Sequence, residues 1–128
     1  MMRTLIGDDG LTRRFVELQN FISMWKNLNL TDEELLELEL FLLEDPKRSP
    51  VIQGTGRLRK SRFSPSTKKS GKSGAYRIIY LDIEQEHLIV LLVVYSKNVS
   101  DNLTKNEANE LKHLVDQLKA HYGGNQNG

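Results

Sequence analysis

The centre of this 128-residue chain concentrates positive charge, a pattern that suits binding or chemistry at phosphate. No acidic residue lies between Pro46 and Leu81, whereas the net charge is −6 over residues 1–45 and −3 over residues 82–128. A solvated surface normally mixes both signs, so a block of one sign points to a polyanionic partner. The ten basic residues of the block are Lys47, Arg48, Arg57, Arg59, Lys60, Arg62, Lys68, Lys69, Lys72 and Arg77.

Other residue types offer fewer chemical options. The chain has no cysteine, which excludes thiolate nucleophiles, thiolate zinc sites and disulfides. The histidines, His87, His113 and His121, have no spacing that suits a metal pair or a nucleophile dyad. Because no carboxylate lies inside the basic block, a magnesium nuclease is disfavoured. We therefore expect no metal and no other cofactor.

Lysine and arginine alone can support metal-independent cleavage of RNA. The 2′-hydroxyl can attack the adjacent phosphodiester, and an enzyme must orient that attack and stabilise the developing negative charge. Arginine suits the second task, and a lysine crowded by other cations could move protons. If residues 57–64 form a strand, its alternation places Lys60 and Arg62 on one face and Arg59 on the other. A solvated surface, or a nucleic-acid-binding face without catalysis, remains the alternative.

The elements that would position these residues begin with helices. Residues 1–11 show no sustained hydrophobic periodicity, so we expect them to be a loosely held leader. Residues 13–18 are expected to form either a short strand or the start of the next helix. A helical pattern follows around Trp25. Thr31 and Glu34 form a capping box for a helix over residues 32–44, which Asp45-Pro46 ends. That helix has a second apolar stripe, which predicts burial on two sides or a partner, and its residues are Leu36, Leu40 and Leu43.

Strands are predicted over residues 57–64, 75–83 and 88–96, with a hairpin connection at 84–87. A second capping box, Thr104 with Glu107, opens a final helix, and residues 123–128 are a tail. The prediction is one α+β domain over residues 1–128: a small antiparallel sheet of three to four strands flanked by N-terminal helices and a C-terminal helix. The longest apolar stretch, residues 88–95, is too short to span a membrane, so we expect a cytoplasmic protein.

Three motifs in order resemble a known family. They are IQGTGRLRKSRF at 52–63, GKSGAYRIIY at 71–80, and YSKN at 95–98 followed by DNLT at 101–104. Together they resemble the HigB-type toxins of the RelE and ParE superfamily over roughly residues 13–120. The resemblance implies a bacterial type II toxin-antitoxin system and a RelE-like fold. It also implies a messenger RNA endoribonuclease, commonly acting in the ribosomal decoding site, which inhibits translation.

The resemblance also implies roles for partners and residues. A cognate antitoxin, a helix-turn-helix protein of the HigA type, would neutralise the toxin and would be its only link to DNA. Arg77 matches an arginine that stabilises phosphate, and Lys60 and Arg62 match a basic pair for proton transfer and phosphate binding. Lys97 would be a further catalytic residue at the end of the last strand. Residues expected to bind RNA are Arg57, Arg59, Lys68, Lys69, Lys72, Tyr80, Tyr95 and Asn98.

Two rival functions remain open at this point. ParE-like members of the same superfamily inhibit DNA gyrase and cleave no RNA. A non-catalytic RNA-binding module would use the basic face only to grip phosphate. RelE-like enzymes keep a catalytic tyrosine after the position of Lys97, and this chain has none there. Either Tyr95 or Tyr80 takes its place, or no tyrosine does.

Overall fold

A five-stranded sheet organises the chain. The structure is a computed structural model that describes residues 2–7, 10, 12–67, 75–96 and 103–123. Within these residues the strands are β1 (Met2–Ile6), β2 (Thr12–Glu17), β3 (Arg59–Phe63), β4 (Tyr76–Ile83) and β5 (Leu88–Ser96). The helices are α1 (Gln19–Asn27), α2 (Asp32–Glu44) and α3 (Lys105–Tyr122), and a 3-10 turn at Glu84–Glu86 joins β4 to β5.

The sheet order is β1-β2-β5-β4-β3, which makes β3 an edge strand. Neighbouring strands are antiparallel except β2 and β5, which run parallel. The prediction of an antiparallel sheet of three to four strands is therefore wrong in two respects: the sheet has five strands and it is mixed. The predicted helix around Trp25, the helix over residues 32–44, the last three strands and the final helix are confirmed.

Residues 2–6 are not a loose leader. They form β1, which pairs with β2 from Met2 opposite Val16 to Ile6 opposite Thr12. The inward positions of β1 are held by Leu5, which packs against the core, and by Arg3, whose Nε lies 2.7 Å from Oε1 of the buried Glu39. An arginine at an inward position hides the usual apolar alternation of a strand, which is why the sequence pattern missed β1.

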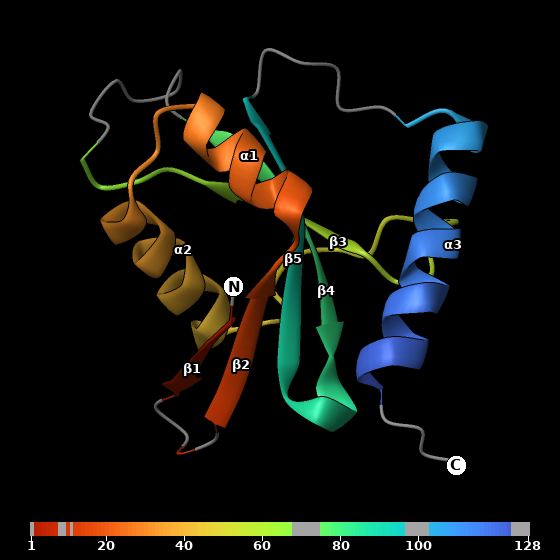
Figure 1. Cartoon of the computed structure of the whole chain (residues 1–128), viewed down its shortest axis with the longest axis horizontal. Coiled ribbons are helices and arrows are strands. Elements are labelled where there is room, and N and C mark those ends of the chain that lie inside the picture. The colour runs from red at the N-terminus through yellow and green to blue at the C-terminus, as the bar shows by residue number, and fades with distance from the viewer. Residues whose placement is uncertain (1, 8–9, 11, 68–74, 97–102, 124–128) are drawn as a thin grey trace.

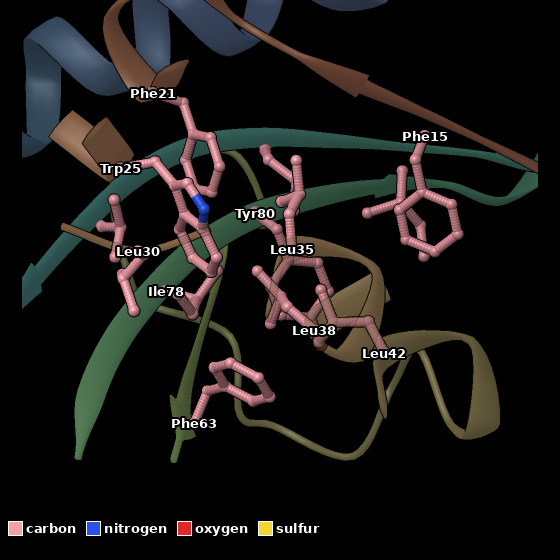
Figure 2. Close-up of a cluster of buried hydrophobic side chains, with 13 residues drawn as sticks. Phe15, Phe21, Trp25, Leu30, Leu35, Leu38, Leu42, Phe63, Ile78 and Tyr80 are labelled. Atoms are coloured by element: carbon pink, nitrogen blue, oxygen red, sulfur yellow. The ribbon is translucent and has the colours of Figure 1, made fainter. Parts of the chain in front are cut away.

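Helices cover both faces of the sheet (Figure 1). On one face α1 and α2 enclose a core that includes Trp25, Leu38 and Tyr80, and Figure 2 shows these side chains gathered against the sheet. On the other face α3 packs through Val115 and Leu118. Within the described part of the chain, no helix combines the length and apolar character that crossing a membrane requires.

Both predicted capping boxes are present. Thr31 N donates to Glu34 Oε1 at 2.8 Å while Glu34 N donates to Thr31 Oγ1 at 3.1 Å, and Thr104 and Glu107 repeat the arrangement at α3. These reciprocal bonds satisfy backbone donors that a helix start leaves free, so they fix where α2 and α3 begin. Of the second leucine stripe on α2, Leu40 is exposed, whereas Leu36 and Leu43 are half-buried.

The pairing of β4 with β5 contains one irregularity that matters for the site. Ile79 lies opposite Val93, but the next residue, Tyr80, lies opposite Leu91. Leu92 is therefore an extra residue on β5, as in a β-bulge. On both sides of Leu92, the two residues of each pair still point to the same face of the sheet. Ile79 and its partner Val93 pack in the core beneath α3, the α3-side core, whereas Tyr80 and its partner Leu91 pack in the core beneath α1 and α2.

Candidate phosphate-binding site

Strand register brings the predicted catalytic residues of β3 and β4 onto one face of the sheet. Arg77 on β4 lies directly opposite Arg62 on β3 and Tyr95 on β5, so these residues form a row across three strands. Side chains paired in this way have Cβ atoms about 5 Å apart. Lys60 lies two residues from Arg62 and opposite Ile79, a residue of the α3-side core. The face that carries the row is therefore the one that α3 covers in part.

The basic residues converge on a cavity at the β3 edge. This basic cavity has a volume of about 460 Å³, and its lining includes Arg48, Lys60, Arg62 and Arg77. No acidic residue is found among the described residues that line it, so the cavity carries a concentrated positive potential. Guanidinium groups also offer paired donors that match phosphate oxygens. The remaining lining residues are Phe41, Ser49, Pro50 and Ser61.

A larger cavity adjoins it on the α3 side. It has a volume of about 1080 Å³ and lies between β3–β5 and the first half of α3. Lys60 lines both cavities, and Tyr95 lines the larger one together with Ile79 and Val93. Lys60 thus stands between the arginine-rich side of the site and the tyrosine side.

Tyr80 and Arg59 lie elsewhere, on the face covered by α1 and α2. Tyr80 is fully buried, its hydroxyl donates to the carbonyl oxygen of Pro46 at 2.7 Å, and burial raises its pKa. A ring without exposed surface cannot contact RNA, so Tyr80 is no longer a candidate for RNA binding. Arg59, opposite Tyr80 in register, donates through Nη1 to the carbonyl oxygens of Ser49 (2.6 Å) and Lys47 (3.3 Å). Both residues instead fix the chain that leaves α2.

Arg57 is also separate from the basic cavity. Its φ is 87°, and it lines a different cavity, of about 380 Å³, which also contains Asp82 and Glu84. Glu84 forms an ion pair with Lys47 at 2.8 Å, and this pairing lowers the pKa of the carboxyl. A mixed-charge cavity is less suited to phosphate. The other predicted residues, Lys68, Lys69, Lys72, Lys97 and Asn98, lie outside the described residues.

Arg48 is the cavity residue whose role the sequence did not reveal, because it follows a helix end and resembles a solvated charge. Its guanidinium lies over the Phe41 ring, 4.2 Å from the centroid, and its Nη2 donates to Glu44 Oε1 at 3.0 Å. Nη2 also donates to the carbonyl oxygen of Phe41, at 3.3 Å. Glu44 and Phe41 lie four and seven residues before Arg48, and this helical spacing is the sequence signal that could have indicated these contacts.

A large pKa shift occurs in a different place, the core between β1, β2 and α2. Burial, and then a hydrogen bond with Glu17, raise the pKa of Glu39 to about 8, and the nearby Arg3 opposes the rise. Both carboxyl groups are buried, so this pair is structural rather than part of the basic cavity. Among the described residues, no three His, Cys, Asp or Glu side chains are grouped so that they could hold a metal ion.

Comparisons with known proteins add one likeness. No protein-family model matches the chain. A solved structure of the E. coli toxin RelE, a mutant in the free state, aligns at 18% sequence identity with a TM-score of 0.49. The alignment covers 75% of this chain and 93% of that chain. We draw nothing about function from a likeness of this degree.

Proposed function

We propose that this protein is the toxin of a type II toxin-antitoxin system and cleaves messenger RNA, in the ribosomal decoding site, by 2′-hydroxyl attack. The observation that carries the proposal is the convergence of Arg48, Lys60, Arg62 and Arg77 on one cavity, with no carboxylate among the described residues of its lining. The order of the three sequence motifs supports the same function.

In the proposed reaction the RNA 2′-oxygen forms a bond to phosphorus and the bond from phosphorus to the 5′-oxygen breaks. Arg77, at the centre of the row, is suited to the non-bridging oxygens, where negative charge builds up, with Arg62 beside it. Lys60 and Tyr95 are the candidates for taking the proton from the 2′-hydroxyl and returning one to the 5′-oxygen. The products are a 2′,3′-cyclic phosphate and a 5′-hydroxyl.

Induction of the chain in bacteria, followed by mapping of messenger RNA ends, tests this function. We expect new 5′-hydroxyl ends within translated regions, and growth arrest. The same cleavage by purified protein on programmed ribosomes should leave 2′,3′-cyclic phosphate ends, since the 2′-hydroxyl is the attacking group. Intact growth with no new ends would refute the toxin proposal, and arrest with altered DNA supercoiling but intact RNA would favour gyrase inhibition.

Variants at Arg77 test the assignment more sharply. Arg77→Ala removes a charge donor to the transition state and should lower the cleavage rate by about 10²–10³-fold. Arg77→Lys keeps the charge without the paired donors and should recover only part of the rate. Lys26→Ala is the matched control, because Lys26 is exposed on α1 and lines none of the cavities described above. An unchanged rate for Arg77→Ala would remove it from the site.

The proposed partner is an antitoxin of the HigA type. It would bring acidic side chains to Lys60, Arg62 and Arg77 or cover the leucine stripe of α2, where Leu40 is 49% exposed. Crosslinking of a purified complex tests this, and a complex that touches neither surface would contradict it.

A further inference from the structure

The basic cavity continues into a groove of different chemistry. This α2–β3 groove has a volume of about 440 Å³ and shares Phe41 and Arg62 with the basic cavity, so the two adjoin. Its walls are largely apolar, and two carboxylates also line it. The lining residues are Glu37, Leu40, Phe41, Glu44, Arg62, Phe63, Ser64 and Ala75.

The groove is suited to a flat, uncharged group. Leu40 is 49% exposed, and the rings of Phe41 and Phe63 lie with centroids 5.8 Å apart at 50°. Glu37 and Glu44 would repel a phosphate, and their oxygens accept hydrogen bonds from amino groups. Glu37 is fixed in place, because Ser66 N donates to its Oε2 at 2.9 Å and Ser66 Oγ donates to its Oε1 at 3.2 Å.

Arg48 links the two compartments. Arg48 lines the basic cavity, while its Cζ lies over the ring of Phe41, a residue that lines both the cavity and the groove. Glu44, a groove residue, holds that guanidinium at 3.0 Å. A ligand that places a phosphate on one side of Phe41 and an apolar ring on the other would satisfy both compartments at once.

We propose that the α2–β3 groove binds the nucleobase adjacent to the cleaved phosphate, with the base packed against Leu40 and Phe41. This inference rests on the proposed RNA cleavage and adds the substrate group that α2 recognises. Single-stranded RNA is the polyanion that fits, because its unpaired bases pack on aromatic side chains and expose polar edges to side chains nearby. A base-paired duplex keeps its bases stacked inside and could not enter the groove.

Binding can be tested separately from cleavage. The probe is a single-stranded RNA with 2′-O-methyl groups, which lack the attacking hydroxyl, measured free and as the decoding-site codon of a programmed ribosome. Each nucleotide in turn is replaced by an abasic one. We expect the replacement at one position to weaken binding by about tenfold, as loss of one base-aromatic contact does.

The variants are Leu40→Ser and Phe41→Leu. Leu40 is exposed, and leucine keeps apolar volume at position 41, so both proteins should fold. Each should weaken binding of the intact RNA by about tenfold and lose the sensitivity to the abasic position. Ile6→Ser is the matched control, because Ile6 is 71% exposed on β1 and lines none of these cavities. It should bind as the wild-type protein does.

Several outcomes would overturn the inference. Equal binding of every abasic RNA, with cleavage intact, removes the base subsite and leaves the ribonuclease proposal standing. If Leu40→Ser releases the antitoxin but keeps base-dependent RNA binding, the groove serves a protein partner instead. Base-dependent binding without cleavage of ordinary RNA supports the subsite and refutes the ribonuclease. The absence of any RNA binding refutes both.

Discussion

Replacing the buried Glu39 with glutamine should change how the stability of this protein depends on pH. Glu39 is fully buried on α2 beside Glu17 of β2, with Arg3 Nε 2.7 Å from its Oε1. Burial, and then the hydrogen bond with Glu17, raise its pKa from 4.5 to about 8. The folded protein therefore keeps the Glu39 carboxyl protonated above pH 4.5, where the unfolded chain releases that proton.

The sign and size of the effect follow from this proton. Its contribution to stability is fully present below pH 4.5 and is lost as the pH rises to about 8. Between those values the free energy of unfolding should fall by about 1.4 kcal/mol per pH unit, up to about 5 kcal/mol in total. Glu39→Gln cannot titrate and keeps a donor toward Glu17, so the variant should lose this slope. Asp82, whose pKa burial also raises, contributes a slope of the same sign in both proteins.

Urea denaturation between pH 5 and 9 measures the effect. Trp25 is the only tryptophan of the chain, is 3% exposed, and stacks on Phe21 with ring centroids 5.6 Å apart, so its fluorescence reports loss of the core. Glu33→Gln removes an exposed carboxylate of the same helix and should keep the wild-type slope. Parallel pH profiles for wild type and Glu39→Gln would refute the reasoning, whatever their vertical offset.

Three further predictions concern other parts of the molecule. Tyr80→Phe removes the hydrogen bond to Pro46 and should lower the free energy of urea unfolding by about 1 kcal/mol without changing RNA cleavage; a loss of cleavage would bring the hydroxyl into the chemistry. Gly56→Ala should destabilise the fold by more than about 1 kcal/mol in thermal unfolding, because φ is +78° and a Cβ would lie 3.1 Å from Val115 Cγ1; an unchanged melting temperature would contradict this. RNA affinity should fall steeply with salt, each phosphate contact adding about 0.7 to the logarithmic slope, and Arg62→Ala should reduce that slope; flat dependence would argue against the basic cavity as the binding site.

Local pattern was sufficient for much of the fold and part of the site. The capping boxes at Thr31 and Thr104 marked two helices, because such bonds depend on residues only three apart. Alternation along β3 placed Lys60 and Arg62 together, since a strand repeats every two residues. The same alternation puts Tyr80, three residues after Arg77, on the opposite face, and it should have excluded Tyr80 from the site.

The remaining features depend on contacts between distant parts of the chain. β1 pairs with β2, and its inward Arg3 contacts Glu39 on α2, a partner 36 positions away that the sequence near Arg3 does not indicate. The parallel pairing of β2 with β5 joins residues more than 70 positions apart. Arg48 became a cavity residue because β3 returns beside the end of α2. Sequence periodicity describes each element but does not specify its neighbours.

The bulge on β5 lets that strand carry one residue more than β4 without disturbing the site. Because Leu92 stays outside the regular pairing, Leu91 lies opposite Tyr80 while Tyr95 lies opposite Arg77. A regular ladder through Leu92 would instead set Tyr95 opposite Tyr76, on the face that α1 and α2 cover. Deletion of Leu92 alone would leave Tyr95 opposite Arg77, so the row tolerates the loss of this residue but not the loss of the bulge while Leu92 is present.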